Sequence, residues 1–152
     1  MLDHSIMLNQ ALDKLGLVQH KIFAETALYE TSNLIRILLT KYQQPEELIL
    51  SILLAFDEIT INALKYAGQA NIIMHVLPNI TLKITIFDYG EGINDIDQAM
   101  RPHFSTDINS LGLGLGIAKS HMDEFSIKSS HQGTCITMKK LLLKQSINLK
   151  II

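Results

Sequence analysis

A narrow polar stripe on an otherwise apolar segment is the first place where this sequence could do chemistry. Residues 46–67 are apolar almost all round, yet Glu58, Asn62 and Lys65 recur at i, i+4 and i+7, with Ser51 in line. At 100° per residue these four side chains share a sector of about 60°. A solvated stripe is the plain alternative, although so apolar a helix is expected to be buried. The residue types fit a general base at Glu58, an oxygen ligand for Mg²⁺ at Asn62 and a phosphate contact at Lys65.

A second group of candidates follows a segment of alternating apolar and polar residues. Residues 80–87 alternate with period two, which predicts a strand and carries Asp88 onto its apolar, core-facing side. A G-x-G pattern at Gly90 and Gly92 comes directly after it. A carboxylate on the core side needs a donor, because burying it unpaired is costly. A ligand amine could supply that donor, while an aspartate that caps the next turn is the structural alternative.

The third candidate group is a run of alternate glycines before a predicted helix, Gly112-Leu113-Gly114-Leu115-Gly116. Such a run exposes backbone N–H groups at the positive end of the helix, where an anion binds readily. A dinucleotide fingerprint would need a strand immediately before the run, but residues 105–110 are polar and loop-like. The chain contains no Gly-Lys-Ser/Thr sequence, which excludes a P-loop.

The elements that must hold these residues are mostly helices early in the chain and mostly strands late in it. Periodicity and breakers predict helices over about 3–16, 27–42, 45–67 and 114–124, and strands over about 18–24, 72–77, 80–87, 127–130 and 134–142. The segment 88–111 is predicted to be loop-rich. This order favours an α+β fold, a two-layer sandwich in which helices cover one face of a mixed, mostly antiparallel sheet.

Composition narrows the class of protein. The 152 residues suit one domain, and 47% apolar with 18% charged residues excludes a disordered chain. A net charge of −2 argues against a dedicated nucleic-acid binder. The single cysteine, Cys135, excludes an internal disulfide, and the six histidines lack metal-ligand spacing. No apolar run approaches a membrane span and the first residues do not look like a signal peptide, so we expect a cytoplasmic protein without a membrane partner.

In their order along the chain, these segments resemble the nucleotide-binding boxes of the GHKL ATPase and kinase superfamily. Residues 57–67 resemble the N box, 88–93 the D-x-G-x-G box, and 111–116 the second glycine box. Gly133-Thr134 resembles the closing G-T pair on the last strand. Within the superfamily, the sequences Phe104-Ser105-Thr106 and Met122-Asp123-Glu124-Phe125-Ser126 resemble the bacterial anti-sigma factors and switch-protein serine kinases of partner-switching pathways.

The resemblance implies that ATP binds between helices and sheet, and it assigns a role to each candidate. Asn62 would hold Mg²⁺ against the phosphates, and Lys65 would help to neutralise them. Asp88 would accept from the adenine amino group with support from Thr134, and Glu58 would take a proton from an attacking hydroxyl. Backbone at Gly90 and Gly92 would pass close to the purine. The lid and phosphate cradle would consist of Ser105, Thr106, Gly112, Leu113, Gly114, Leu115 and Gly116.

The implied function is that of a Mg–ATP-dependent serine/threonine kinase that phosphorylates a small antagonist protein, with a sigma factor as a further expected partner. A non-catalytic ATP-binding regulatory module and a detached histidine-kinase catalytic domain are the open alternatives. The ATP-binding domain would span 18–143, between a helical extension at 1–17 and a tail at 144–152. The apolar stripe of the extension is expected to pack on its own domain, and a partner or homodimer surface is the alternative.

Overall fold

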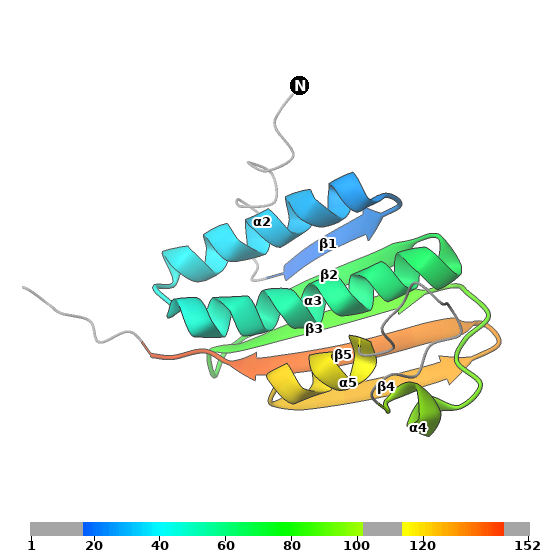
Figure 1. Cartoon of the computed structure of the whole chain (residues 1–152). Coiled ribbons are helices and arrows are strands. Elements are labelled where there is room, and N and C mark those ends of the chain that lie inside the picture. The colour runs from blue at the N-terminus through cyan, green and yellow to red at the C-terminus, as the bar shows by residue number, and fades with distance from the viewer. Residues whose placement is uncertain (1–16, 102–113, 145–152) are drawn as a thin grey trace, which may run out of the picture.

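The computed structural model describes residues 17–101 and 114–144, which form one α+β layer structure (Figure 1). Its elements, in chain order, are β1 (Leu17–Ile22), α2 (Glu25–Lys41), α3 (Glu46–Ala67), β2 (Ala70–Leu77), β3 (Thr81–Asp88), α4 (Ile96–Ala99), α5 (Gly114–His121), β4 (Glu124–Ser130) and β5 (Gly133–Leu141). The predicted helix at 3–16, most of the predicted lid and the tail from residue 145 lie outside the described residues.

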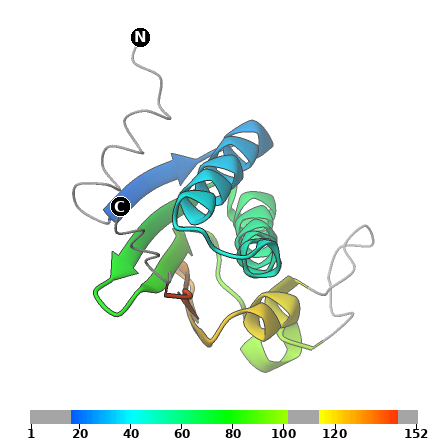
Figure 2. The same ribbon diagram turned by 90° about the vertical axis from the view of Figure 1, so that its left-hand side faces the viewer.

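The five strands form a single sheet in the order β1-β2-β3-β5-β4. Every pairing among them is antiparallel, so the sheet is simpler than the mixed arrangement that the sequence led us to expect. Helices α2, α3 and α5 lie together on one face of the sheet, and no described helix covers the other face (Figure 2). The predicted two-layer sandwich is thereby confirmed.

The core lies between the helical layer and the sheet, and it follows from the two periodicities of the sequence. Leu82, Ile84 and Ile86 alternate along β3 and are at most 2% exposed. Ile52 and Phe56 of α3 are fully buried against this face. Burying one such side chain contributes about 1.5–3 kcal/mol to folding. Because α3 is long, many of its apolar side chains are buried, and together they hold the helix on the sheet. Among the described helices, none is long and apolar enough to cross a lipid bilayer.

The ends of α3 follow the predicted signals. Its N-cap is Pro45, with two acids in the first turn near the positive end of the helix dipole. It stops at Gly68, whose φ of 75° is left-handed and whose N–H donates to the Leu64 carbonyl. The strands predicted at 72–77 and 80–87 are both present and form a hairpin at Pro78-Asn79, closed by the Ile80 N–H on the Leu77 carbonyl.

The second half differs from the prediction at the junction of α5 with β4 and in one additional short helix. Helix α5 ends at His121 rather than near 124, because Glu124 already pairs with Lys139 in the sheet. Strand β4 therefore begins three residues before the predicted start. Its outward residues are polar, so its first residues show too little apolar alternation to indicate a strand. Helix α4 lies in a segment that we expected to be loop, and four residues are too few to show a helical period.

Candidate functional site

A cavity of about 430 Å³ opens between α3 and the end of β3. Its wall combines apolar residues of the two layers, such as Ile59, Ala63 and Ile86, with polar groups that converge from several elements. The polar groups are Asn62 and Tyr66 of α3, Asp88 at the end of β3, Glu91, Asn94 and Asp95 of the loop after β3, Gln98 of α4 and Thr134 of β5. A mostly apolar hollow with few polar groups is the usual form of a small-molecule site.

Asp88 is held in one orientation by two backbone donors. Its Oδ1 accepts from the Gly90 N–H at 2.9 Å and from the Thr134 N–H at 3.3 Å. Both bonds fall on Oδ1, so neither uses Oδ2. The two alternatives that the sequence left open are therefore compatible: one oxygen closes the next turn, and the carboxyl group also lines the cavity. Its placement on the core side of β3 is as predicted.

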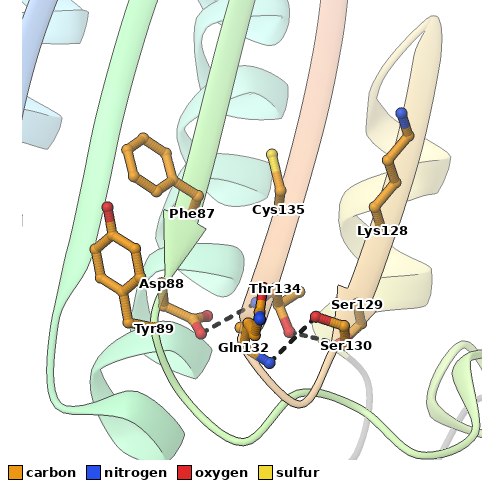
Figure 3. A pocket seen from close by; sticks show the side chains of 10 residues that line it. Phe87, Asp88, Tyr89, Lys128, Ser129, Ser130, Gln132, Thr134 and Cys135 are labelled. Carbon is orange, nitrogen blue, oxygen red and sulfur yellow. Dashed lines mark hydrogen bonds between the residues drawn. The ribbon is translucent and has the colours of Figure 1, made fainter.

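Thr134 belongs to a second set of hydrogen bonds beside Asp88 (Figure 3). Its Oγ1 lies 2.8 Å from the Ser129 Oγ, which also accepts from the Ile93 N–H at 2.7 Å. These bonds tie β4 and β5 to the loop that follows β3. The sequence analysis did not select Ser129. It pairs with Thr134 in the sheet, so the two side chains lie on the same face of the sheet, and alternation along β4 is the signal that could have indicated this.

The two glycines after Asp88 are needed for close packing of the loop. A Cβ at Gly90 would lie 2.8 Å from the Ala67 Cβ, so the loop passes directly against the end of α3. Gly92 has φ of 83°, and a Cβ there would overlap the Ser130 carbonyl oxygen. Only glycine fits this conformation and this contact without strain. The structure thus gives both residues a packing reason, in addition to the ligand approach predicted from sequence.

Helix α5 lies along the polar stripe of α3. At its first residue, a Cβ on Gly114 would lie 2.9 Å from the Asn62 Nδ2 and 3.0 Å from the Glu58 Oε2. At its last residue, the His121 Nδ1 lies 3.3 Å from the Ser51 Oγ. At Ser51, Glu58 and Asn62 the stripe is therefore not a solvated face, because these polar groups meet the two ends of a neighbouring helix, whereas Lys65 is exposed. The predicted glycine run places the positive end of α5 at Asn62 and Glu58.

Of the other predicted site residues, some line the cavity and others do not. Leu115 lines the cavity, whereas a Cβ at Gly116 would lie 2.7 Å from the Met100 carbonyl oxygen and Gly116 itself is not in the wall. Lys65 is also not in the wall; its Nζ lies 5.4 Å from the ring centroid of Tyr66, which does line the cavity. Glu58 lies beside the wall, at Gly114. Ser105, Thr106, Gly112 and Leu113 lie outside the described residues.

Tyr66 and Gln98 are wall residues that the sequence analysis did not select. Tyr66 stands four residues after Asn62, so the helical period alone would have placed it on the same side of α3. Gln98 offered no comparable signal, because it lies in the four-residue helix α4. Among the described residues, no group of three or more His, Cys, Asp or Glu side chains forms a ready metal site.

Asp57, the neighbour of Glu58, faces away from the cavity toward α2. Burial raises the pKa of its carboxyl above the usual 3.8, a hydrogen bond with Ser32 lowers it in part, and the charge of Glu58 raises it further. The Asp57 Oδ1 and the Thr60 Oγ1 are buried and have no hydrogen-bond partner among the described residues. Helix α3 thus carries, off the stripe, two buried polar atoms whose desolvation no hydrogen bond from a described residue offsets.

Comparison with known proteins places this arrangement among nucleotide-binding domains. The family model described as histidine kinase-like ATPase domain matches residues 24–140. An anti-sigma F factor of Heyndrickxia coagulans is 39% identical over 71 residues, which cover 44% of this chain and 48% of that protein. The chain thus matches about half the length of this curated relative.

Two solved structures share the fold at low sequence identity. The RsbU and RsbW domains of Rv1364c from Mycobacterium tuberculosis match with a TM-score of 0.58 and 16% identity, over 82% of this chain and 32% of that one. The SiaB–SiaC complex from Pseudomonas aeruginosa matches with a TM-score of 0.56 and 13% identity, over 94% of this chain and 99% of that one. At such identities the likeness supports the fold alone.

Proposed function

Because the chain belongs to the family of histidine kinase-like ATPase domains, we propose that its cavity binds ATP with Mg²⁺ and that it transfers the γ-phosphoryl group to a serine or threonine of a small antagonist protein. The observation that carries this proposal is the carboxyl group of Asp88. It is fixed in a cavity between helix and sheet by two backbone donors, and its Oδ2 is not used by either bond.

The cavity suits an adenine base at the Asp88 end. A purine is flat and largely apolar, and the wall offers Ile59, Ala63 and Ile86 against its faces. Its exocyclic amine needs an acceptor, which the Asp88 Oδ2 supplies. Thr134 fixes the carboxyl through its N–H and adds a hydroxyl to the same wall. A preorganised acceptor favours binding because little side-chain freedom is lost.

The phosphates would lie at the other end, where the start of α5 meets Asn62. The amide oxygen of Asn62 is a suitable ligand for Mg²⁺, which is commonly held by few protein groups together with phosphate oxygens. When bound, the ion neutralises phosphate charge. Gly114, Leu115 and the N–H groups at the start of α5 would receive the phosphate chain. Lys65 would neutralise phosphate from the rim beyond Tyr66, and Ser105, Thr106, Gly112, Leu113 and Gly116 would complete the lid.

Glu58 is the proposed general base. Its Oε2 lies close to Gly114, so the carboxylate stands where the phosphate end of the site begins. In the transfer, the acceptor oxygen bonds to the γ-phosphorus, the bond from phosphorus to the ADP oxygen breaks, and the hydroxyl proton passes to Glu58. Phosphoryl transfer depends mainly on positioning and charge neutralisation, so one base and one ion are sufficient.

The partners that we propose rest on the relatives. The anti-sigma F factor name of the Heyndrickxia coagulans relative supports a sigma factor as a bound partner. The antagonist protein as substrate rests on the resemblance of residues 104–106 and 122–126 to the partner-switching serine kinases. The SiaB–SiaC complex supports a protein partner for this fold. We further propose a cytoplasmic location and a homodimer, with residues 1–17 as an extension of a nucleotide-binding domain at 18–143.

Calorimetry with Mg–ATP and a γ-phosphate transfer assay test this function, the assay using a candidate antagonist protein encoded beside this chain. Asp88→Asn should weaken ATP binding at least tenfold, because an amide cannot supply the same fixed acceptor. Glu58→Gln should bind ATP like the parent chain yet lose 10²–10⁴-fold in transfer rate, the usual contribution of a general base. Glu30→Gln, an exposed change on α2, is the control.

The product and the binding data discriminate the alternatives. Failure of the folded chain to bind ATP would contradict the proposal. Binding without transfer would identify a non-catalytic ATP-binding regulatory module. A phosphorylated product that is stable to alkali and labile to acid would identify a histidine-kinase catalytic domain.

A further inference from the structure

The face of the sheet that no described helix covers has a charge pattern of its own. Along each strand, every second side chain points toward this open face and away from the core. The charged side chains that the described strands place on it are Lys21 of β1, Lys83 of β3, Lys139 of β5, and Lys128 and Glu124 of β4. Four lysines and one glutamate give the open face a formal charge of +3. The whole chain carries −2, so the remainder carries −5.

These charges lie in two rows across the strands. In one row, Lys21 and Lys128 stand at the two ends, with Asn71, Phe87 and Cys135 between them. In the other row, His75, Lys83, Lys139 and Glu124 are neighbours. The rows are four residues apart along each strand, or roughly 14 Å at about 3.4 Å per residue.

The row between the two basic rows is uncharged. It consists of Ile73, Thr85, Thr137 and Ser126 on β2, β3, β5 and β4. Of the lysines, Lys139 has an ion pair, at 3.0 Å to Glu124. Lys21, Lys83 and Lys128 have no ion pair with any described residue. The open face therefore offers an uncharged centre of one aliphatic and three hydroxyl side chains, between two rows that each hold a lysine without an ion pair to a described residue.

One end of the open face is hollowed. A depression of about 700 Å³ lies over the ends of β3, β5 and β4, lined by Phe87, Tyr89, Lys128 and Cys135 among others (Figure 3). The rings of Phe87 and Tyr89 meet edge to face, with their centroids 6.0 Å apart, and Tyr89 is 71% exposed. Exposed aromatic side chains are typical of the centre of a protein interface.

We propose that the open face binds an acidic segment of a protein partner, with its carboxylates on the two basic rows and its apolar side chains in the depression and central row. Five strands at about 4.8 Å and seven residues at about 3.4 Å give a face of roughly 600 Å², within the range of a transient interface. Most of this surface lies on the opposite side of the sheet from the proposed nucleotide cavity, and the two meet at Asp88 and Thr134, which line both the cavity and the depression.

A protein fits this face better than a nucleic acid does. The cations are lysines, the centre is aliphatic and hydroxylic, and the remainder of the chain is acidic and would repel a long polyanion. A protein segment that carries both leucine and glutamate matches both features of the face. Its carboxylates would also speed association, since complementary charge mainly raises the on-rate.

The first test uses a fluorescein-labelled peptide of six Glu-Glu-Leu repeats and the full chain, followed by fluorescence anisotropy. The peptide should bind with an affinity that falls as sodium chloride is added, and a Lys-Lys-Leu peptide should not bind. Lys83→Glu with Lys128→Glu, one change in each basic row, should weaken binding at least tenfold. Lys119→Glu with Lys144→Glu makes the same change in net charge at exposed sites off the open face, and should weaken it less than twofold.

The second test uses Cys135, the only cysteine of the chain, as a native probe. Iodoacetamide, which is uncharged, should alkylate Cys135 in the folded protein, and the acidic peptide should slow the reaction at least fivefold. Circular dichroism melts of all variants show whether the fold is intact. If a pair of substitutions prevents folding, the proposal is still tested by whether the acidic peptide slows alkylation of Cys135 in the parent chain.

Four results would overturn the proposal. Equal loss of binding in the two variant pairs would mean that net charge, not this face, attracts the peptide. Equal binding of the Lys-Lys-Leu peptide would mean that the contact is not selective for acidic segments. A twenty-nucleotide oligouridine that binds more tightly would point to a nucleic acid. Cys135 that reacts only after unfolding would mean that the chain itself or a second copy covers the face.

Discussion

Asp88 illustrates how one residue serves both fold and site. Period-two alternation along β3 carries it to the core side, and the turn that follows supplies the Gly90 N–H at 2.9 Å. Because Thr134 of β5 is its register partner, a second backbone donor comes from the neighbouring strand. The carboxyl group is therefore oriented before any ligand arrives, and the strand, the turn and the sheet each contribute to that orientation.

Gly114→Ala should separate activity from stability. The added Cβ would meet the Asn62 Nδ2 at 2.9 Å and the Glu58 Oε2 at 3.0 Å, and both are ends of side chains that can move. Stability should therefore change by less than about 1 kcal/mol, the usual helix preference of alanine over glycine. Phosphoryl transfer should fall at least tenfold, because small displacements of catalytic groups are costly. Thermal melts and the transfer assay measure both quantities.

Gly92→Ala is the matched contrast to Gly114→Ala. Its Cβ would overlap a backbone atom, the Ser130 carbonyl oxygen, and its φ of 83° is left-handed. Backbone cannot move aside as a side chain can, so we expect a loss of about 2 kcal/mol or more in unfolding free energy. A Gly92→Ala protein as stable as the parent chain would show that the loop after β3 is less constrained than its packing indicates.

Asp57→Asn should stabilise the protein at neutral pH. Burial, and to a lesser degree Glu58, holds the pKa of Asp57 above 3.8, against a partial lowering by Ser32. When the pKa of an acid is higher in the folded than in the unfolded protein, the folded state prefers the protonated acid. Its contribution to stability is therefore complete below the unfolded pKa and is lost as the pH rises through the folded pKa. Removing the charge should therefore raise the urea midpoint at pH 7, and the gain should disappear near pH 4.

The control for Asp57→Asn is Glu30→Gln, which removes an acid at an exposed site of α2. It should leave the urea midpoint almost unchanged at both pH values. If Asp57→Asn instead lowered the midpoint at pH 7, the ionised carboxylate would be required in the folded state, and its unpartnered Oδ1 would need a buried water or another donor.

Among elements, the long periodic ones could be predicted and the short ones could not. Helix α3 was predicted from Pro45 to Gly68, because an apolar stripe, a proline start and a glycine stop all agreed. Helix α4 and the first residues of β4 were missed, since four residues show no period and an edge strand with polar outer residues shows little apolar alternation. The cavity wall depends on both kinds, through Asn62 and Gln98.

The position of α5 could not be predicted from the sequence, although its existence could. The stripe of Ser51, Glu58 and Asn62 indicated that something polar must face α3. The structure shows this to be the two ends of α5, at Gly114 and at His121. Such a contact joins residues more than fifty positions apart, which no local pattern encodes. The same holds for Ser129 and Ile93, 36 residues apart and joined by one hydrogen bond.

The link between the α2–α3 turn and the end of β5 depends on Gln44, which is 7% exposed. Its Nε2 donates to the Leu143 carbonyl at 3.0 Å, and its Oε1 accepts from the Leu143 N–H at 2.8 Å. The amide thus pairs with the backbone much as a neighbouring strand would. Gln44→Ala should lower the free energy of unfolding by about 1–3 kcal/mol, the range for losing buried hydrogen bonds.

Chemical denaturation measures the effect of Gln44→Ala, with Gln132→Ala as the control because the Gln132 side chain is exposed in the β4–β5 turn. Hydrogen exchange at the Leu143 amide gives an independent measurement and should speed up in Gln44→Ala alone. An unchanged denaturation midpoint together with unchanged exchange would contradict the proposed link between the two segments.

For the whole molecule, the two sides of the sheet have different tasks. The helical side buries the core and forms the cavity, while the open side carries a formal charge of +3 on the described strands. Asp88 and Thr134 line both the cavity and the edge of the depression on the open face. A ligand that orders these residues is therefore in a position to stabilise the ends of β3 and β5 together.

Ligand binding should accordingly appear as global stabilisation. A ligand that binds the folded state alone adds about 2.7 kcal/mol at a concentration of one hundred times its Kd. For a domain of this size, 1 kcal/mol shifts Tm by roughly 2–4 °C, so saturating Mg–ATP should raise Tm by about 5–11 °C. Asp88→Asn should abolish most of this shift, because it removes the proposed contact with adenine. Glu58→Gln should retain the shift, because it removes the proposed base and leaves the nucleotide contacts in place. An equal Tm shift in Asp88→Asn would mean that the nucleotide binds elsewhere than in the cavity between α3 and β3.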